Sequence, residues 1–569
     1  MPIRFNPTGT FDIATDPCDL PFQVDGKIVV SGAMARCTNL TLDRQGIAST
    51  RLGSAKVNGS ALDQTSITRL LEMAGYRYAF AGTKIYRDEV SIATGLTAAQ
   101  WSGALHNAYN TTTQAIFALN GTDRKRIEGA SVNEWGIDAP TVAPTLAVGA
   151  LAGLTGDYNA RYTYCRKEGA LLVCESNPSP AASAAVSLSN QSLSVTWTAS
   201  GDSQVTHVRI YRTLTGGAVY YYDQEVAVPT TTLDTNTDDS ALGTEVATDH
   251  NRPPAGTVVL GPAYQGTLFI LKDNLLYYSL PNQPEYWPAT YYIEVCPVQY
   301  SLRAGAFLDG QLFLSNGVEI YAIMGTGHQS FYPLPMSAMT GVINQDSFLA
   351  VKGHGIFRIA IDVLYQYTGG KDNLISRGQF EPLFQGNTIG SVPGLNRTYI
   401  DRCWLAFFRG KLFFAYPGGA SAYPDNMLVL DLATDKGAHY QFGAYFQCAA
   451  LDATNKRLLA GDTGGYIWEL EKLSQTTDGG AAISWQIQTM DFNQLHKYFP
   501  RYARYDVTLG TGAASVYGHI LLDDVIKQSH LLSESRQTRK RHVIGCTGDR
   551  MAARLAGEGP VDIYGIEIE

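Results

Sequence analysis

The sequence predicts an all-β protein, and three observations lead to this fold class. Of the 569 residues, 56 are Gly and 33 are Tyr; Gly supplies tight turns and Tyr favours strands. Apolar runs of about four to seven residues alternate with turn residues along most of the chain. Helical periodicity is almost absent, and the best helical candidate, residues 66–73, can equally form an alternating strand.

One unit recurs along the chain: a turn, a short apolar strand, a second turn, and a second strand rich in Tyr, Ile or Trp. Its copies span residues 266–278, 309–323, 346–359, 409–432 and 455–470. Their first strands begin near residues 268, 312, 348, 412 and 458, so most steps lie near the 40–50-residue period of propeller blades. The longest step contains an extra loop around residues 368–398. Weaker copies occur at residues 76–86 and 114–121. The repeats predict a β-propeller of about six to eight blades; unrelated β-sandwich strands are the alternative.

A different unit interrupts the repeats. An Ala- and Pro-rich linker begins at residue 138, and residues 252–256 return the chain to the repeats. Between them, a strand ending in Trp197 precedes an alternating strand that ends in Tyr211-Arg212-Thr213. A Trp followed by such a strand resembles a fibronectin type III sandwich. Its core is expected to contain Trp197, Val208, Ile210 and Tyr222.

These patterns divide the chain into four parts. Residues 1–137 hold N-terminal strands and the first blades, residues 138–252 the inserted sandwich, and residues 253–480 the main blades. Residues 481–569 alternate apolar and polar positions, as a half-buried sheet does. We expect these C-terminal strands to close the propeller or the tube.

Charge and cysteine content bear on nucleic-acid binding, membrane insertion and disulfide formation. The net charge is −9 and only 17% of residues are charged, which does not favour a nucleic-acid-binding face. The basic runs at residues 124–126 and 536–542 are interpreted as solvated strand edges or intersubunit contacts. We identify no signal peptide and no apolar run long enough to span a membrane. The eight scattered cysteines predict buried thiols, with a Cys165–Cys174 bridge across a hairpin as the alternative.

No catalytic motif is found, and we expect no catalytic, cofactor or metal site. Gly201-Asp202-Ser203 has only the tripeptide of a nucleophile loop and lies in an expected turn. The acidic segment 234–245 departs from a calcium loop because Asp239 stands where Gly is needed. Asp401, Asp425 and Asp431 have no spacing typical of an acid–base pair. The ten histidines form no ligand cluster in the sequence.

Three features together resemble the tail nozzle (tail tubular) proteins of short-tailed bacteriophages. The first is an N-terminal pattern in which Asp19-Leu20-Pro21, residues 37–46 and Arg51-Leu52-Gly53 follow one another. The second is Tyr277-Tyr278-Ser279 followed by residues 282–288, Asn-Gln-Pro-Glu-Tyr-Trp-Pro, whose prolines would fix a rigid loop around Trp287. The third is the fibronectin-like insertion between early and later blades.

The resemblance implies a structural virion protein without catalytic residues. Six copies would form a ring below the portal–adaptor complex, bind tail fibres or a tip protein, and retain and conduct genomic DNA without reading its sequence. Such a protein would assemble in the host cytoplasm and reside in the virion tail. The alternative is a receptor- or glycan-binding propeller of a tail fibre or surface protein; a propeller enzyme would need a carboxylate or metal cluster.

Overall fold

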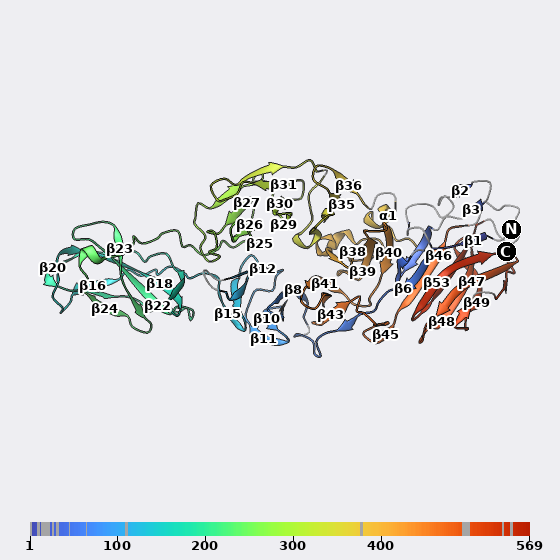
Figure 1. Cartoon of the computed structure of the whole chain (residues 1–569), viewed down its shortest axis with the longest axis horizontal. Coiled ribbons are helices and arrows are strands. Elements are labelled where there is room, and N and C mark those ends of the chain that lie inside the picture. The colour runs from blue at the N-terminus through green and yellow to red at the C-terminus, as the bar shows by residue number, and fades with distance from the viewer. Residues whose placement is uncertain are drawn as a thin grey trace. The chain divides into compact units, whose positions relative to one another are not determined.

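The computed structural model describes residues 3–7, 12, 23–24, 28–29, 33–44, 46–63, 65–107, 112–338, 340–375, 379–491, 501–537, 540–546 and 550–569. Strands make up 51% of the chain and helices 3% (Figure 1), so the predicted all-β class is confirmed. The ambiguous segment 66–73 is a strand, β8 (Ile67–Met73). Asp19-Leu20-Pro21 lies outside the described residues.

The chain forms two compact units. Unit 1 contains residues 1–90, 315–320 and 336–569, and unit 2 contains residues 91–314 and 321–335. Both are built mainly from four-stranded antiparallel meanders, because each short apolar strand ends in a tight turn that returns the chain alongside it. Residues such as Asp273, Asp309 and Arg409 have positive φ values at these turns.

Four meanders lie wholly or mainly in unit 1. The first is β8 with β9 (Tyr76–Ala81), β10 (Lys84–Arg87) and β11 (Val90–Ala93), and the second is β33 (Phe348–Val351), β34 (Gly355–Ile359), β35 (Leu364–Tyr367) and β36 (Asp372–Leu374). The third is β37 (Trp404–Phe408), β38 (Lys411–Tyr416), β39 (Asn426–Asp431) and β40 (Lys436–Tyr440). The fourth is β41 (Phe446–Asp452), β42 (Arg457–Asp462) and β43 (Ile467–Leu470) with β7 (Ala55–Lys56). The last meander takes its fourth strand from the N-terminal part of the chain, since β7 pairs with β43 through Lys56–Trp468 and Ala55–Glu469. The extra loop after β36 contains the short helix α1 (Glu381–Phe384).

The C-terminal strands form sheets with N-terminal ones. A nine-stranded sheet continues from β37–β40 through β4 (Met34–Thr38), β46 (Ser484–Thr489), β52 (Met551–Glu558), β48 (Ala514–Leu522) and β49 (Val525–Leu531). A seven-stranded sheet contains β1 (Ile3–Phe5), β5 (Leu40–Arg44), β6 (Ile47–Thr50), β53 (Val561–Ile568), β47 (Tyr502–Leu509), β50 (Arg536–Gln537) and β51 (His542–Val543). The strand that completes the last meander is β7, from the N-terminal part of the chain.

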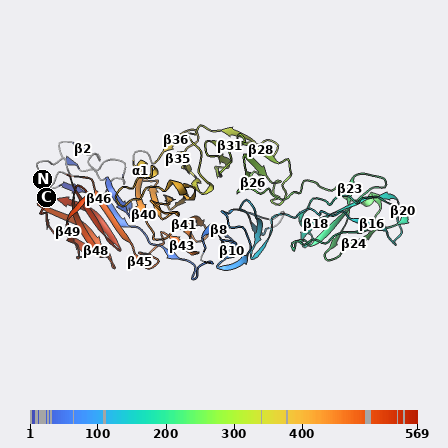
Figure 2. The same ribbon diagram turned by 180° about the vertical axis from the view of Figure 1, so that it is seen from behind.

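Unit 2 holds three meanders and a sandwich. The meanders are β12 (Ser102–Asn107), β13 (Gln114–Leu119), β14 (Arg124–Glu128) and β15 (Ser131–Glu134); β25 (Val258–Ala263), β26 (Thr267–Lys272), β27 (Leu275–Tyr278) and β28 (Tyr292–Glu294); and β29 (Ala304–Leu308), β30 (Gln311–Ser315), β31 (Ile320–Met324) and β32 (Tyr332–Pro335). Figures 1 and 2 both show the sandwich strands β16–β24 grouped apart from these meanders.

The sandwich has a four-stranded sheet that faces shorter ones. The four strands, in sheet order, are β19 (Leu171–Glu175), β18 (Ala160–Glu168), β22 (His207–Thr213) and β23 (Tyr220–Ala227). The shorter sheets contain β16 (Thr145–Val148), β21 (Leu193–Thr196) and β24 (Thr232–Thr235), and β17 (Leu154–Tyr158) and β20 (Val186–Gln191).

The predicted core of the sandwich is correct in three of four positions. Trp197, Val208 and Ile210 share one buried cluster. The prediction for Tyr222 is wrong. In the register of β22 and β23, Tyr222 lies opposite Tyr211, the neighbour of Ile210, and so its side chain lies on the other face of the sheet. A β-bulge between Ile210 and Tyr211 shifts the pairing there, which strand alternation alone does not reveal.

Gly53 offers a test of the packing between the N-terminal segment and β44 (Thr477–Asp478). A Cβ atom at Gly53 would lie 2.1 Å from the carbonyl oxygen of Thr477. We expect Gly53→Ala to lower the free energy of unfolding by about 2–4 kcal/mol, because backbone would have to move. Gly59→Ala, at which nothing lies within 4 Å, is the matched control and should be neutral or slightly stabilising. Equal unfolding midpoints in urea for both variants would contradict this packing.

Candidate functional site

A buried charge cluster in unit 1 joins two of the sequence motifs. The Arg51 guanidinium is fully buried and pairs with Asp478 through Nη2–Oδ2 at 2.6 Å and Nη1–Oδ1 at 3.1 Å. Its Nε donates to Asn39 Oδ1 at 2.9 Å, and its plane lies 3.8 Å from the ring centre of Phe442. We call Arg51, Asp478, Asn39 and Phe442 the Arg51 cluster. All three nitrogens of the guanidinium thus have acceptors and one of its faces lies on Phe442, which indicates a structural role.

The Arg51 cluster sets the course of the N-terminal strands. Asn39, with a φ of 56°, stands between β4 and β5 and directs one into each large sheet. Asp478 also accepts hydrogen bonds from the backbone N–H and the hydroxyl of Ser54, one residue before β7. The motif residues Asn39 and Arg51 therefore hold β4, β5 and β7 in their places.

A second cluster, in unit 2, is built around the Pro-Glu-Tyr-Trp segment that ends at residue 287. Glu285 is buried and pairs with Arg166, while Arg126 Nε lies 3.7 Å from Glu285 Oε1. Burial opposes ionisation, but the two guanidinium charges outweigh it and hold the pKa of Glu285 below its ordinary value. We call these three residues the Glu285 cluster. Because Arg166 belongs to β18 and Arg126 to β14, the cluster ties the sandwich to a meander.

The aromatic residues around Glu285 complete this connection. The carbonyl oxygen of Pro284 accepts hydrogen bonds from the indoles of both Trp135, at 2.8 Å, and Trp287, at 2.9 Å. The Tyr286 hydroxyl accepts the backbone N–H of Glu175 in β19. The expected rigid loop around Trp287 is therefore present. It contacts Trp135, next to the meander β12–β15, through Pro284, and β19 of the sandwich through Tyr286.

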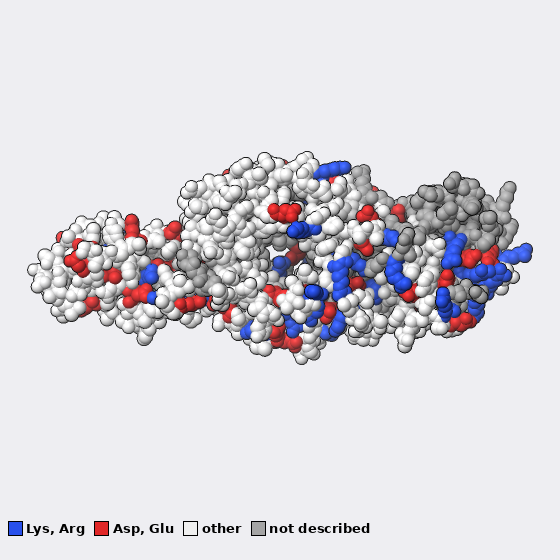
Figure 3. Space-filling view, viewed as in Figure 1, with Lys and Arg blue, Asp and Glu red and all other residues white. Residues whose placement is uncertain are grey.

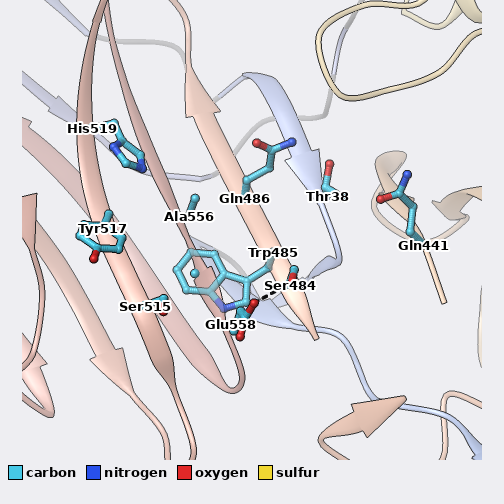
Figure 4. A pocket seen from close by; sticks show the side chains of 11 residues that line it. Thr38, Gln441, Ser484, Trp485, Gln486, Ser515, Tyr517, His519, Ala556 and Glu558 are labelled. Carbon is cyan, nitrogen blue, oxygen red and sulfur yellow. Dashed lines mark hydrogen bonds between the residues drawn. The ribbon is translucent and has the colours of Figure 1, made fainter. Parts of the chain in front are cut away.

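A groove of about 310 Å³ lies on the nine-stranded sheet of unit 1 (Figure 4). Its polar walls come from alternate positions of neighbouring strands: Thr38 on β4, Ser484 and Gln486 on β46, Glu558 on β52, and Ser515, Tyr517 and His519 on β48. Gln441 lies at one side. Ala556 pairs with Gln486 on one neighbour and with Tyr517 on the other. A methyl group between two long side chains leaves the hollow open.

The basic runs take up structural ion pairs. Arg126 is 2% exposed and also pairs with Glu128, and Lys125 pairs with Glu134, so residues 124–126 do not form a solvated edge. Basic side chains also gather over the C-terminal strands (Figure 3), where Lys540 pairs with Glu534 and Arg541 with Glu569. Arg539 lies outside the described residues.

The carboxylates considered for catalysis or for calcium binding each bond to a different partner. Asp425 and Asp431 lie at opposite ends of β39; Asp425 accepts the backbone N–H of Gly418, and Asp431 accepts that of Ala433. Asp239 pairs with Arg212 at 2.6 Å. Asp202 accepts the backbone N–H of Gln204, in a turn as expected.

Two further positions complete the sequence candidates. Asp401 lies in a 3-10 helix, where its carbonyl oxygen accepts a hydrogen bond from Asn344. Within the described part of the chain, no three His, Cys, Asp or Glu side chains are grouped so that they could hold a metal ion.

Cys165 and Cys174 are both buried free thiols. In the register of β18 and β19, Cys165 lies opposite Glu175, and Cys174 lies opposite Arg166, the residue after Cys165. Because adjacent residues of a strand point to opposite faces, the two cysteine side chains lie on opposite faces of their hairpin. The alternative of a bridge between them is therefore wrong.

Comparison with known proteins identifies no family for this chain. No protein-family model matches the chain, and no curated protein matches it. Among solved structures, a crystal structure of the computationally designed Ika8 protein aligns with 74% of this chain and 99% of its own, at 11% identity and a TM-score of 0.31. No helix among the described residues is long and apolar enough to cross a membrane.

Removing the charge of Arg51 should destabilise unit 1 strongly. In Arg51→Met, the Asp478 carboxylate, whose side chain is 11% exposed, remains without its cation, and we expect a loss of about 3–5 kcal/mol in unfolding free energy. The control Arg44→Met removes an arginine that is 59% exposed and pairs with Asp562 at 3.6 Å, so it should cost about 1 kcal/mol or less. Asp478→Leu in the Arg51→Met background should recover part of the loss. Chemical denaturation of all three variants measures this, and equal losses for Arg51→Met and Arg44→Met would contradict it.

Glu285 should make the stability of unit 2 depend on pH. Because its pKa is lower in the folded than in the unfolded chain, its stabilisation is complete above the unfolded value of about 4.3 and is lost as pH falls through the folded value. Glu285→Gln should lose about 3–5 kcal/mol at pH 7. The difference from the parent chain should shrink at acidic pH.

Urea unfolding followed by tryptophan fluorescence at several pH values measures this dependence. Glu534→Gln, which changes a side chain that is 58% exposed, should follow the parent curve at every pH. A deficit in Glu285→Gln that stays the same from pH 7 down to the lowest pH at which the parent chain folds would show that the charge of Glu285 does not stabilise unit 2.

Proposed function

We propose that this chain is a structural, non-enzymatic subunit of the tail nozzle of a short-tailed bacteriophage. One observation carries the proposal. The sandwich β16–β24 stands in the chain after the meanders β8–β11 and β12–β15 and before five further meanders, which is the order that the sequence resemblance implies. The motif residues that carry the resemblance support it as well, because they form the Arg51 and Glu285 clusters.

The seven meanders are, in this proposal, seven blades of a propeller. The last blade combines β41–β43 with β7, so the two halves of the chain share one sheet. A shared blade holds a ring of sheets closed without a free end. Each blade then presents only short edge strands, which resist unwanted pairing.

The inserted sandwich is, in the same proposal, a fibronectin type III-like domain. Support comes from Trp197, Val208 and Ile210 in one core and from the sheet order β19-β18-β22-β23. The ends of the insertion are held together, since Arg252 pairs with Asp138 at 2.6 Å. Arg166 and Tyr286 connect the domain to the meanders. A domain that contacts a neighbouring subunit or a fibre requires such a connection.

The proposed role is mechanical. Six subunits would form a ring below the portal–adaptor complex through heterologous contacts. The ring would retain the genome and conduct it at ejection, and a net charge of −9 disfavours adhesion of DNA to the wall. Tail fibres or a tip protein would bind to it. The separation of Asp425 from Asp431 and their occupied hydrogen bonds support a non-enzymatic role.

The mass of the assembly tests this proposal. We expect particles of six times the 61.8 kDa chain, alone or with the adaptor, and ring-shaped images with a central hole. Mass photometry over a range of protein concentrations, with negative-stain images of the same sample, measures both. A chain that stays monomeric even with virion proteins present, or one that hydrolyses a polysaccharide or an ester, would contradict the proposal.

A further inference from the structure

The groove on the nine-stranded sheet has unused hydrogen-bonding groups. Among the described residues, no hydrogen bond is made by the Tyr517 hydroxyl, the Ser515 hydroxyl or His519 Nε2. The Thr38 hydroxyl is itself buried and has no hydrogen-bond partner in the part of the chain that the structure describes; Thr38 is 5% exposed. A buried polar group without a partner is costly. The Ser515 and Tyr517 hydroxyls lie on exposed residues and can bond a ligand or water.

The local backbone turns these groups toward the groove. The pairing of β48 with β52 shifts between Ala514 and Tyr517, and Ser515 has a φ of 52°. A bulge of this kind re-aims side chains. Here it places Ser515, Tyr517 and His519 along one wall, with Ser484 and Gln486 across the Ala556 floor (Figure 4).

The chemistry of the walls selects the ligand. Hydroxyls, amides and one carboxylate offer both donors and acceptors, and burial together with the charge of Arg554 lowers the pKa of His519, so the imidazole is neutral at pH 7. Tyr517 is 37% exposed and stacks on His519 with 5.8 Å between ring centres, so the tyrosine ring is held in place and offers an apolar face. Of the described residues, Glu558 is the only carboxylate that lines the groove, and it would repel an anion.

We propose that this groove binds a neutral saccharide. One face of a sugar ring would lie against Tyr517. Its hydroxyls would bond Ser515, the amide oxygen of Gln486, whose Nε2 donates to Ser391, and Glu558, which also accepts from Ser484. A volume of about 310 Å³ is near the lower end of the about 300–1,000 Å³ range of ligand sites, so it suits one or two sugar rings. This binding goes beyond the mechanical role and does not depend on it, since the groove lies wholly within unit 1.

The test is direct binding to the full-length chain. Neutral monosaccharides and disaccharides of glucose, galactose, mannose and N-acetylglucosamine, with glucuronate as the acidic comparison, are titrated and followed by ligand-observed NMR and calorimetry. We expect at least one neutral sugar to bind with a dissociation constant in the millimolar range or below. Glucuronate should bind more weakly. Tyr517→Ala and Gln486→Leu should each weaken binding of the neutral sugar about tenfold or more.

Tyr445→Ala is the matched control, because Tyr445 is a 49% exposed tyrosine of unit 1 that does not line the groove. It should leave binding unchanged. Thermal unfolding of each variant separates lost binding from lost folding, and Gln486→Leu serves if Tyr517→Ala does not fold. Absence of binding by every sugar tested, or binding that Tyr517→Ala and Gln486→Leu leave intact, would overturn the proposal. Ring formation is measured independently by particle mass, so the two proposals fail separately.

Discussion

The ion pair between Arg51 and Asp478 is the interaction on which the architecture of unit 1 depends. The two residues are 427 positions apart in the chain, yet they fix where β4, β5 and β7 begin and end. Burying two charges is costly unless each is paired and hydrogen-bonded. Asn39, Ser54 and Phe442 meet that requirement, so the pair can form only when all of these segments are in place. It therefore acts as a condition on the fold more than as a source of net stability.

Unit 2 uses the same physical principle in another form. There, Glu285 lies between two buried arginines, one of which also pairs with Glu128, and the carbonyl oxygen of Pro284 accepts hydrogen bonds from two indoles at once. A short loop thus provides an acceptor for groups on the sandwich and on the meanders. Small domains joined by flexible linkers normally move freely relative to their neighbours. A buried, directional network of this kind restricts such movement in unit 2.

Much of this organisation could be predicted from the sequence, and the failures have identifiable causes. Hairpins at residues 266–278 and 455–470 could be predicted because alternation and turn residues are local signals. Tyr222 was misplaced because a bulge changed the pairing, and bulges leave no clear trace in alternation. The partner of Arg51 was missed, because Asp478 is an ordinary turn residue by its neighbours alone. The groove has a weak signal, the polar positions 515, 517 and 519 within β48, but its depth depends on Ala556 of another strand.

The shared meander has a consequence for how the chain is made. Strand β7 emerges early from the ribosome, whereas its partner β43 follows only after some four hundred more residues. At about 5–20 residues per second, that wait lasts from roughly twenty seconds to more than a minute. For most of that time β1, β4 and β7 lack the strands with which they pair in the finished molecule. Since contacts between distant parts of a chain also form slowly, the nascent chain must keep its first strands from pairing elsewhere until the last meander is synthesised.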